Sequence, residues 1–409
     1  MDLDTILSDP QSALGHLERY VNDGSPSGFT ALHRTSSLTD PFGDQTSFAP
    51  YVLFDSEASF STFGALVSHN ILKNNLMFIH PDMAHHPDLS GYDVSECDDL
   101  RVVPTSSART VQIINHFPND YIKLYYDGIV GRHNRRLYRT KAIAGPEISG
   151  LLLSAIDLHQ LPDYLAILHE PCARIHRNRN HEDPGNDWGM VWRESHPRGT
   201  AANRVHWIAP LFSLWSKDRL NPGQPTLLEQ LSELWMHRAE EHILTLLRNI
   251  IDIHFTLVSK LGLQFEFNAQ NVLLGFDDEC QIVTVILRDM MDVEKDIAIR
   301  HSLNLPLDFA SYPYHVLSES DKLFAQKRRS FAFDFKLCKY IVSPLLTNGH
   351  LYGASSFERI LSDLKAHTST WIKRLPAEYF PQNGLWYAYA RVLVDTNKVL
   401  IANQEPLLR

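Results

Sequence analysis

The sequence predicts an α+β protein with a sheet-rich N-terminal lobe followed by a mainly helical lobe that contains a β-hairpin. Short apolar runs separated by Pro, Asn, Asp and Gly dominate residues 51–143, which is typical of strands. Apolar residues at helical spacing dominate from residue 144 onward. The length of 409 residues exceeds what a single hydrophobic core usually supports. We therefore expect more than one lobe and a cleft between lobes.

The chain divides into three parts. Residues 1–50 are rich in Ser, Thr, Asp, Gly and Pro, and we expect a loosely packed lead-in segment with one helix at Pro10–Val21. Its start, Ser8-Asp9-Pro10, has an N-cap residue followed by proline, as helices often do. Residues 51–143 are the sheet-rich lobe and residues 144–409 the mainly helical lobe.

Two antiparallel hairpins are predicted. The first joins a strand within residues 109–116 to Tyr121–Tyr126 through a Phe-Pro-Asn-Asp turn. The second joins Asn271–Leu274 to Ile282–Leu287 through a turn that begins with glycine. The second hairpin lies between helical segments.

Helical segments are predicted at Gly145–His159 and Leu161–Leu168 and, as a long amphipathic stretch, at Thr226–Leu261. The long stretch is followed by Gly262, a plausible C-cap, and its length indicates either a kinked helix or two helices. The segment Arg174–Arg204 lacks periodicity and is expected to be a long surface loop.

Composition excludes several classes of protein. The chain has 38 Lys+Arg and 48 Asp+Glu, a net charge of −10, which argues against a dedicated nucleic-acid binder and makes any anion site local. The 4 cysteines form no C-x-x-C pair, which favours a reducing compartment. The sequence begins without a signal-peptide pattern and has no apolar run of the ~18 residues that cross a bilayer, so we expect a cytoplasmic protein without membrane contact.

Three oxygen-bearing side chains flank the second hairpin. Glu266 precedes Asn271 by five residues, and Asp289 follows the returning strand. Such ligands suit Mg²⁺, and kinase-like folds use a loop Asn and a strand-end Asp in a similar arrangement. The alternative is that Gln270-Asn271 is only a polar turn and that Arg288-Asp289 pairs locally.

Cations and hydroxyls gather around the first hairpin. Lys123 lies within the second strand, where it can bind phosphate or, alternatively, be an exposed edge-strand lysine. Ser107, Arg109 and Thr110 offer two hydroxyls and a guanidinium to an anion. Arg135 belongs to a run of five cations that ends at residue 141, and such a run is often only a solvated face.

In this order, the motifs resemble those of the IucA/IucC-like synthetases, the NRPS-independent siderophore (NIS) synthetase family. The chain is shorter than usual for that family, so we expect a divergent and shortened member. The elements that carry the resemblance are Ser107/Arg109/Thr110, Lys123-Leu124, Arg135, Glu266/Gln270/Asn271 and Arg288-Asp289.

The resemblance implies an ATP- and Mg²⁺-dependent ligase with a palm region distantly akin to kinases. Such an enzyme adenylates a carboxylic acid, releases pyrophosphate and AMP, and condenses the acid with an amine or alcohol in siderophore-type or related specialised-metabolite biosynthesis. Residues 51–143 would then be a nucleotide-binding lobe and residues 144–409 a catalytic lobe with a metal-binding hairpin. We also expect small-molecule substrates and a homodimer.

The family's functional residues map onto this chain by its motifs. The catalytic candidates are Lys123, Arg135 and Arg109, the nucleotide-binding candidates are Ser107, Arg109, Thr110, Lys123, Arg135, Gln270 and Asn271, and the metal candidates are Glu266, Asn271 and Asp289.

Departures from the family pattern concern the acid substrate. Asn268 stands where the family has His, so the position cannot carry a positive charge. Gly131 stands where Thr is common, and the early His-Pro stretch is only echoed around His80. Arg391 is the stand-in for the basic motif near the C-terminus. The substrate candidates are therefore Asn268, His80 and Arg391, and the acid need not be citrate.

Two other functions are open. A kinase-like phosphotransferase would use the same phosphate and metal groups, but its glycine-rich loop is missing, since residues 127–131 do not read G-x-G-x-x-G. A non-catalytic nucleotide-binding scaffold is the third possibility, because of Asn268 and Gly131.

Overall fold

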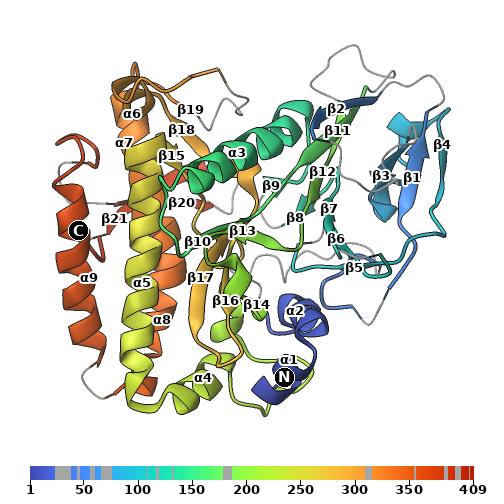
Figure 1. Ribbon diagram of the computed structural model, residues 1–409. Coiled ribbons are helices and arrows are strands. Elements are labelled where there is room, and N and C mark those ends of the chain that lie inside the picture. Colours follow the sequence, from blue (N-terminus) through green and yellow to red (C-terminus); the bar gives the residue numbers. More distant parts are fainter. Residues whose placement is uncertain are drawn as a thin grey trace.

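The computed structural model has the predicted α+β architecture, with a sheet-rich half and a helix-rich half (Figure 1). Two large hydrophobic clusters fill them. One joins the helices to a five-stranded sheet, and the other lies between a six-stranded and a three-stranded sheet. The residues that the structure describes are 1–23, 38–43, 47–55, 60–65, 76–107, 109–116, 119–130, 133–177, 187–308, 316–353, 356–381, 386–391, 398–404 and 406–409.

The six-stranded sheet is antiparallel throughout, in the order β2-β11-β12-β7-β6-β5. β6 and β7 form the first predicted hairpin, with Thr110 opposite Lys123. The strands are β2 (Phe60–Gly64), β5 (Val102–Pro104), β6 (Thr110–Ile113), β7 (Tyr121–Lys123), β11 (Cys172–His176) and β12 (Trp188–Arg193). The neighbouring three-stranded sheet contains β3 (Leu76–Ile79), β1 (Tyr51–Phe54) and β4 (Asp93–Glu96).

The five-stranded sheet has the order β13-β10-β17-β16-β14, and only the β10–β17 pair is parallel. Its hairpin β16–β17 is the second predicted hairpin, which is thereby confirmed. The strands are β10 (Leu165–Leu168), β13 (Pro197–Gly199), β14 (Trp207–Pro210), β16 (Val272–Phe276) and β17 (Ile282–Leu287).

Two short segments connect these two sheets directly. Residues 169–171 lead from β10 to β11, and residues 194–196 lead back from β12 to β13. The helix predicted at Leu161–Leu168 is therefore wrong, since its second half is β10. The surface loop predicted at Arg174–Arg204 is also wrong, because it contains most of β11 and all of β12 and β13. β10, β11 and β12 are buried on both faces, so they show none of the alternation that identifies a half-buried strand.

The long helical stretch consists of two helices. Thr226 closes a capping box at the start of α4 (Leu227–Trp235), and the chain breaks at Met236, whose φ is 49°. α5 (Ala239–Thr256) then continues into a π-helical turn that ends at Gly262, where φ is 59°, so the predicted glycine cap is confirmed.

Of the remaining helices, α9 packs along α5 in the helix-rich half, whereas α3 packs on β11 and β12 of the six-stranded sheet (Figure 1). The remaining helices are α3 (Arg139–Asp157), α6 (Ile297–Ser302), α7 (Lys322–Ser330), a π-helix (Phe331–Val342), α8 (Ser343–Thr347) and α9 (Ser356–Ile372). The remaining strands are β8 (Ile129–Val130), β9 (His133–Asn134), β15 (Leu263–Gln264), β18 (Glu294–Asp296), β19 (Val316–Leu317), β20 (Trp386–Arg391) and β21 (Lys398–Gln404).

The N-terminal segment begins with α1 (Leu3–Ser8) and α2 (Pro10–Arg19), and Asp9 caps α2 as predicted. The expectation of a loosely packed lead-in is wrong for these helices. α2 packs on β14, and its buried apolar residues belong to the molecule's core. The composition of residues 1–50 as a whole is polar and does not reveal this packing. The apolar side chains of α2 lie on one face of the helix, and that face alone packs on the core.

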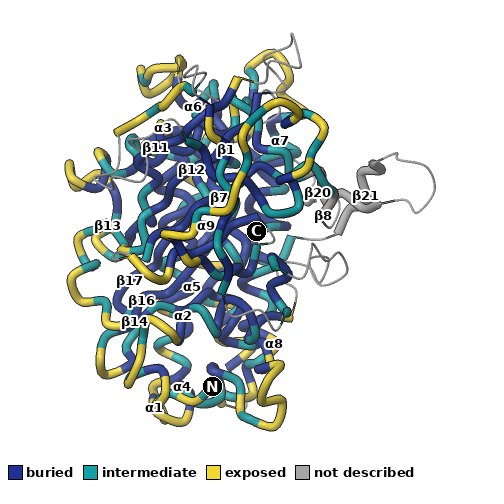
Figure 2. Tube along the Cα trace, turned by 90° about the vertical axis from the view of Figure 1, so that its right-hand side faces the viewer, coloured by how far each residue is buried: buried dark blue, intermediate teal, exposed yellow. Residues whose placement is uncertain are grey.

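Buried residues extend through the interior, including most of α5 and the β16–β17 hairpin (Figure 2). The four cysteines are free, and three of them are buried. Within the described ranges, no helix combines the length and apolar character needed to cross a membrane.

Candidate active site

A polar cleft with about 590 Å³ of empty space lies where the six-stranded sheet meets the β16–β17 hairpin. Its lining contains five cations and a single carboxylate, so its formal charge is strongly positive in a protein that is acidic as a whole. This cleft is a local concentration of positive charge of the kind that an anion site in an acidic protein requires. The lining residues are Thr105, Ser106, Ser107, Arg109, Thr110, Tyr121, Lys123, Arg135, Arg193, Gln270, Asn271, Arg288 and Asp289.

One wall is the turn between β5 and β6, which we call the serine loop (residues 105–107 and 109–110). The backbone N–H of Thr105 donates to the carbonyl of Thr110 at 3.1 Å, and the N–H of Thr110 donates to the carbonyl of Ser107 at 3.2 Å. The Thr105 hydroxyl also accepts from the N–H of Ser107 at 3.2 Å. These bonds hold the loop tightly, so its hydroxyls line the cleft in a fixed arrangement.

Arg109 and Arg135 form a cationic pair at the cleft. The Arg109 guanidinium donates to the backbone carbonyl of Arg135, and burial together with the nearby Arg135 charge lowers the pKa of Arg109 to about 10. Arg109 therefore stays protonated at neutral pH. No carboxylate of the described residues lies within ion-pair distance of either guanidinium, which leaves both charges available to an anion.

Lys123 and Asp289 meet across the cleft as an ion pair. β7 lies inside the six-stranded sheet, between β6 and β12, so the alternative of an exposed edge-strand lysine is wrong. Burial, partly offset by Asp289, lowers the pKa of Lys123 to about 8. Burial disfavours the charged form of Asp289, but Lys123 and Arg193 outweigh it and hold the pKa of Asp289 below its ordinary value. Asp289 also has a left-handed backbone, with φ 71° and ψ 65°, directly after β17.

Arg193 contributes a cation that the sequence analysis missed. It ends β12, its Nε and Nη2 lie 3.0 and 2.7 Å from Oε1 of the fully buried Glu170, and its Nη2 lies 3.6 Å from Asp289. Burial raises the pKa of Glu170, while the Glu170 and Asp289 charges overcome burial and raise the pKa of Arg193. The signal for Arg193 was the run Trp-Gly-Met-Val-Trp-Arg, whose strand-forming residues lie within the segment that we predicted to be a loop.

The loop before β16 is organised by Asn268. Its side-chain oxygen accepts hydrogen bonds from the backbone N–H groups of Gln270 and Asn271, at 3.0 and 2.9 Å. The Asn271 amide nitrogen donates to the carbonyl of Glu266 at 3.4 Å. Asn268 is buried and does not line the cleft, so the structure gives it a loop-positioning contact rather than the substrate contact that we expected.

Of the three predicted metal ligands, Asn271 and Asp289 line the cleft and Glu266 does not. The Glu266 carboxylate instead pairs with Lys336, on the π-helix. Among the described residues, no group of three or more His, Cys, Asp or Glu side chains forms a metal cluster. The Asn271 and Asp289 oxygens suit a hard cation whose other ligands come from phosphate and water.

The other substrate candidates lie apart from the cleft lining. His80 is fully buried, and its Nδ1 accepts from the N–H of Asp82 at 3.1 Å, where it caps a short 3₁₀ helix. Its ring packs against Tyr126, with centroids 4.6 Å apart. Arg391 is the last residue of β20, and its side chain lies outside the described residues, as does the whole of Gly131.

No family model and no curated protein sequence matches the chain. Solved structures do match. The petrobactin biosynthesis protein AsbB from Bacillus anthracis str. Sterne superposes with a TM-score of 0.66 at 13% identity, over 88% of this chain and 68% of AsbB. The aerobactin synthetases IucC and IucA, both from a hypervirulent pathotype of Klebsiella pneumoniae, superpose with TM-scores of 0.62 and 0.61 at 16% and 14% identity.

The chain has the fold of IucA and IucC. The matches cover 88% of this chain and 70% of IucC, and 83% of this chain and 65% of IucA. A structure of ATP-bound IucA also matches, with a TM-score of 0.62 at 14% identity. The resemblance to IucA/IucC-like synthetases is therefore confirmed at the level of the fold, whereas the kinase-like palm stays a prediction.

Proposed function

We propose that this protein is an ATP- and Mg²⁺-dependent ligase that adenylates a carboxylic acid and condenses it with an amine or alcohol in siderophore-type biosynthesis. The observation that carries this proposal is the cleft itself, which gathers Arg109, Lys123, Arg135, Arg193 and Arg288 around one carboxylate. The fold shared with aerobactin synthetases, one of them described as ATP-bound, supports the same function.

The distribution of charge in the cleft suits a triphosphate. Three of the five cations have an acidic partner, and Arg109 and Arg135 have none within the described residues. Arg109 and Arg135 would bind phosphate oxygens, and Lys123 would exchange Asp289 for a phosphate. The hydroxyls of Ser107 and Thr110 and the side-chain amide of Gln270 would complete the nucleotide site by hydrogen bonding.

These cations also serve the reaction. A carboxylate that attacks the α-phosphorus approaches a polyanion, and fixed positive charges stabilise the negative charge that grows on the phosphoryl oxygens. Pyrophosphate leaves while the acid becomes an acyl adenylate. Attack of the amine or alcohol on the acyl carbon then releases AMP, and no residue of the chain forms a covalent intermediate.

Asn271 and Asp289 would hold Mg²⁺ at the cleft. The ion would neutralise phosphate charge and fix the orientation of the triphosphate. With Asp289 as a metal ligand, the Lys123 ammonium would lose its partner in the ion pair and would be available to a phosphate oxygen.

The contact between Glu266 and Lys336 favours a ligase over a phosphotransferase. A phosphotransferase needs an acidic base near the acceptor hydroxyl, and Glu266 is the residue that the motif offers for that role. An ion-paired carboxylate outside the cleft lining is poorly suited to accept that proton.

The test is product analysis. The protein is incubated with ATP, Mg²⁺ and panels of carboxylic acids and amines, and the nucleotide products are separated. AMP together with pyrophosphate is the expected result. ADP without AMP would refute the ligase, and ATP binding without turnover on broad panels would indicate a scaffold.

A matched pair of variants shows whether the cleft is responsible. Lys123→Met removes the paired lysine in the cleft, whereas Lys217→Met removes an exposed lysine that pairs with Glu229 elsewhere. We expect only Lys123→Met to abolish AMP formation. Equal activity of the two variants would place the chemistry outside this cleft.

A further inference from the structure

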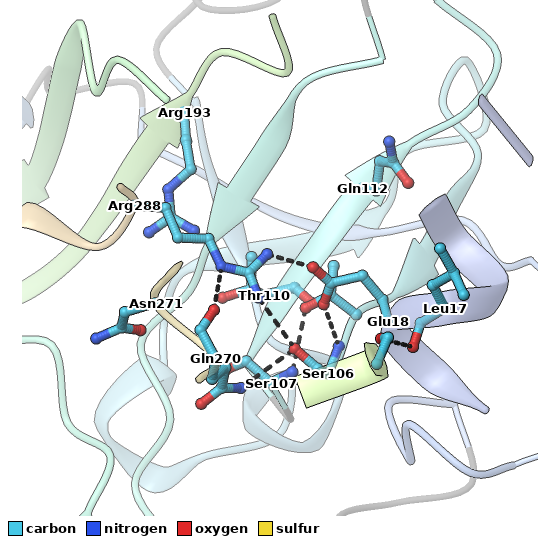
Figure 3. Close-up of polar contacts among 12 residues, drawn as sticks. Leu17, Glu18, Ser106, Ser107, Thr110, Gln112, Arg193, Gln270, Asn271 and Arg288 are labelled. Carbon is cyan, nitrogen blue, oxygen red and sulfur yellow. Dashed lines mark hydrogen bonds and ion pairs between the residues drawn. The ribbon is translucent and has the colours of Figure 1, made fainter. Parts of the chain in front are cut away.

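Glu18, on the N-terminal helix α2, is a buried residue whose carboxylate contacts two residues of the cleft lining, Arg288 and Ser106. It is 2% exposed, although glutamate is rarely buried without a partner. Its Oε1 pairs with Arg288, and its Oε2 accepts from the backbone N–H of Ser106 at 3.1 Å. Figure 3 shows this carboxylate between the Arg288 guanidinium and the serine loop.

Arg288 in turn contacts the loop before β16, which forms another part of the cleft lining. Its Nε donates to the carbonyl of Gln270 at 2.8 Å, and its Nη2 lies 3.4 Å from the hydroxyl of Ser106 (Figure 3). The Gln270 side-chain amide donates to the same hydroxyl at 3.2 Å. Glu18 therefore joins α2, the serine loop and the loop before β16, three segments that are far apart in the sequence.

Glu18 supplies the negative charge that keeps the Arg288 guanidinium in its present position. Arg288 is 5% exposed, and Glu18 is its one acidic partner in ion-pair contact among the described residues, so without Glu18 it would be a buried cation without a counter-charge. A buried cation that loses its counter-charge turns toward the nearest anion or water. Here the nearest open space is the cleft, so Arg288 would leave Gln270 and Ser106.

We propose that Glu18 is a positioning residue for the nucleotide site, which acts through Arg288 and the serine loop to fix Ser106 and Gln270 where a nucleotide meets them. This inference rests on the function proposed above. Glu18 does not line the cleft, so it acts on the ligand only through the groups that it holds.

Glu18→Gln tests the proposal because it keeps the shape and removes the charge. Arg288 and the Ser106 N–H contact different oxygens of Glu18, and glutamine has an oxygen at only one of these two positions, so one of the two bonds is lost together with the negative charge. We expect the KM for ATP to rise about tenfold with little change in kcat. Glu18→Asp keeps the charge and should recover most of the affinity.

His16→Ala is the matched control on the same helix. His16 Nε2 lies 2.9 Å from Asp218, outside the cleft, so this variant loosens α2 without touching Arg288 or Ser106. We expect its KM for ATP to match that of the wild type. If both variants raise KM equally, Glu18 only anchors the helix and the proposal is wrong.

Hydrogen exchange gives a readout that does not depend on ATP. Glu18→Gln should speed exchange at the amides of Ser106 and Gln270, whereas His16→Ala should not. Unchanged exchange at both amides would overturn the inference. If the wild-type protein shows no ATP binding, the proposed function fails, and the exchange result alone decides whether Glu18 orders the two loops.

Discussion

The buried pair of Glu170 and Arg193 allows a quantitative prediction about stability. Glu170 is 0% exposed and Arg193 4% exposed, and two nitrogens of Arg193 contact the same carboxylate oxygen. Removing one member of such a pair leaves an uncompensated buried charge, which costs about 3–5 kcal/mol. We expect Arg193→Met to show this full loss. Glu170→Gln should cost less, because Asp289 lies 3.6 Å from Arg193 and remains as a counter-charge.

Replacing both members by apolar residues should recover stability. Double replacement of a buried pair is often neutral or stabilising, so Glu170→Leu/Arg193→Met should be more stable than Arg193→Met alone. The assay is urea unfolding followed by tryptophan fluorescence, since Trp192 is buried beside Arg193. Strictly additive losses in the double variant would refute the reasoning.

The same pair predicts a pH effect with a definite sign. Burial raises the pKa of Glu170, and Arg193 opposes it, so removing Arg193 raises that pKa further. A raised folded-state pKa means that the native protein binds the proton more tightly than the unfolded chain, so stability falls as pH rises through it. The deficit of Arg193→Met relative to the wild type should therefore shrink as the pH is lowered, while an unchanged deficit would count against a charged Glu170.

Three further outcomes follow from the site and from one turn. Asp289→Asn should lower turnover about a hundredfold or more, because it weakens both the metal ligand and the partner of Lys123, and steady-state kinetics at varied Mg²⁺ measures this. Lys123→Gln should weaken ATP binding in calorimetry, because it removes one of the five cations that line the cleft. Gly262→Ala should lower the urea midpoint, because φ is 59° and an added Cβ would lie 2.4 Å from Cγ of Arg300; an unchanged midpoint would mean that the turn relaxes freely.

The sequence was sufficient to predict the parts of the site that lie on hairpins. A turn-forming cluster between two strand-like runs predicts β6–β7 and β16–β17 locally, and each hairpin fixes where its end residues point. The strand patterns place Lys123 and Asp289 on their hairpins, and the family resemblance is what puts the two residues in one site. In the structure the two side chains form an ion pair, so they do lie side by side.

The residues that were missed act across long sequence separations. Glu18 reaches Arg288 over 270 positions, and Arg193 reaches Asp289 over 96 positions, so no local pattern shows either contact. Strands buried on both faces lose the alternation that identifies them, and this hid β12 and with it Arg193. Glu266 was assigned by motif spacing, which carries no information about Lys336 on a π-helix 70 residues later.

The two short connections between the five-stranded and the six-stranded sheet limit how far the sheets can move apart. Residues 169–171 and 194–196 each span at most about 11 Å when fully extended, so the two sheets cannot separate where Glu170 and Arg193 meet. Lys123 and Asp289 are joined only by their charges and can part when a ligand replaces one of them. The Glu170–Arg193 pair therefore lies where the chain itself ties the two sheets together, and Arg193 also contacts Asp289 there, at 3.6 Å.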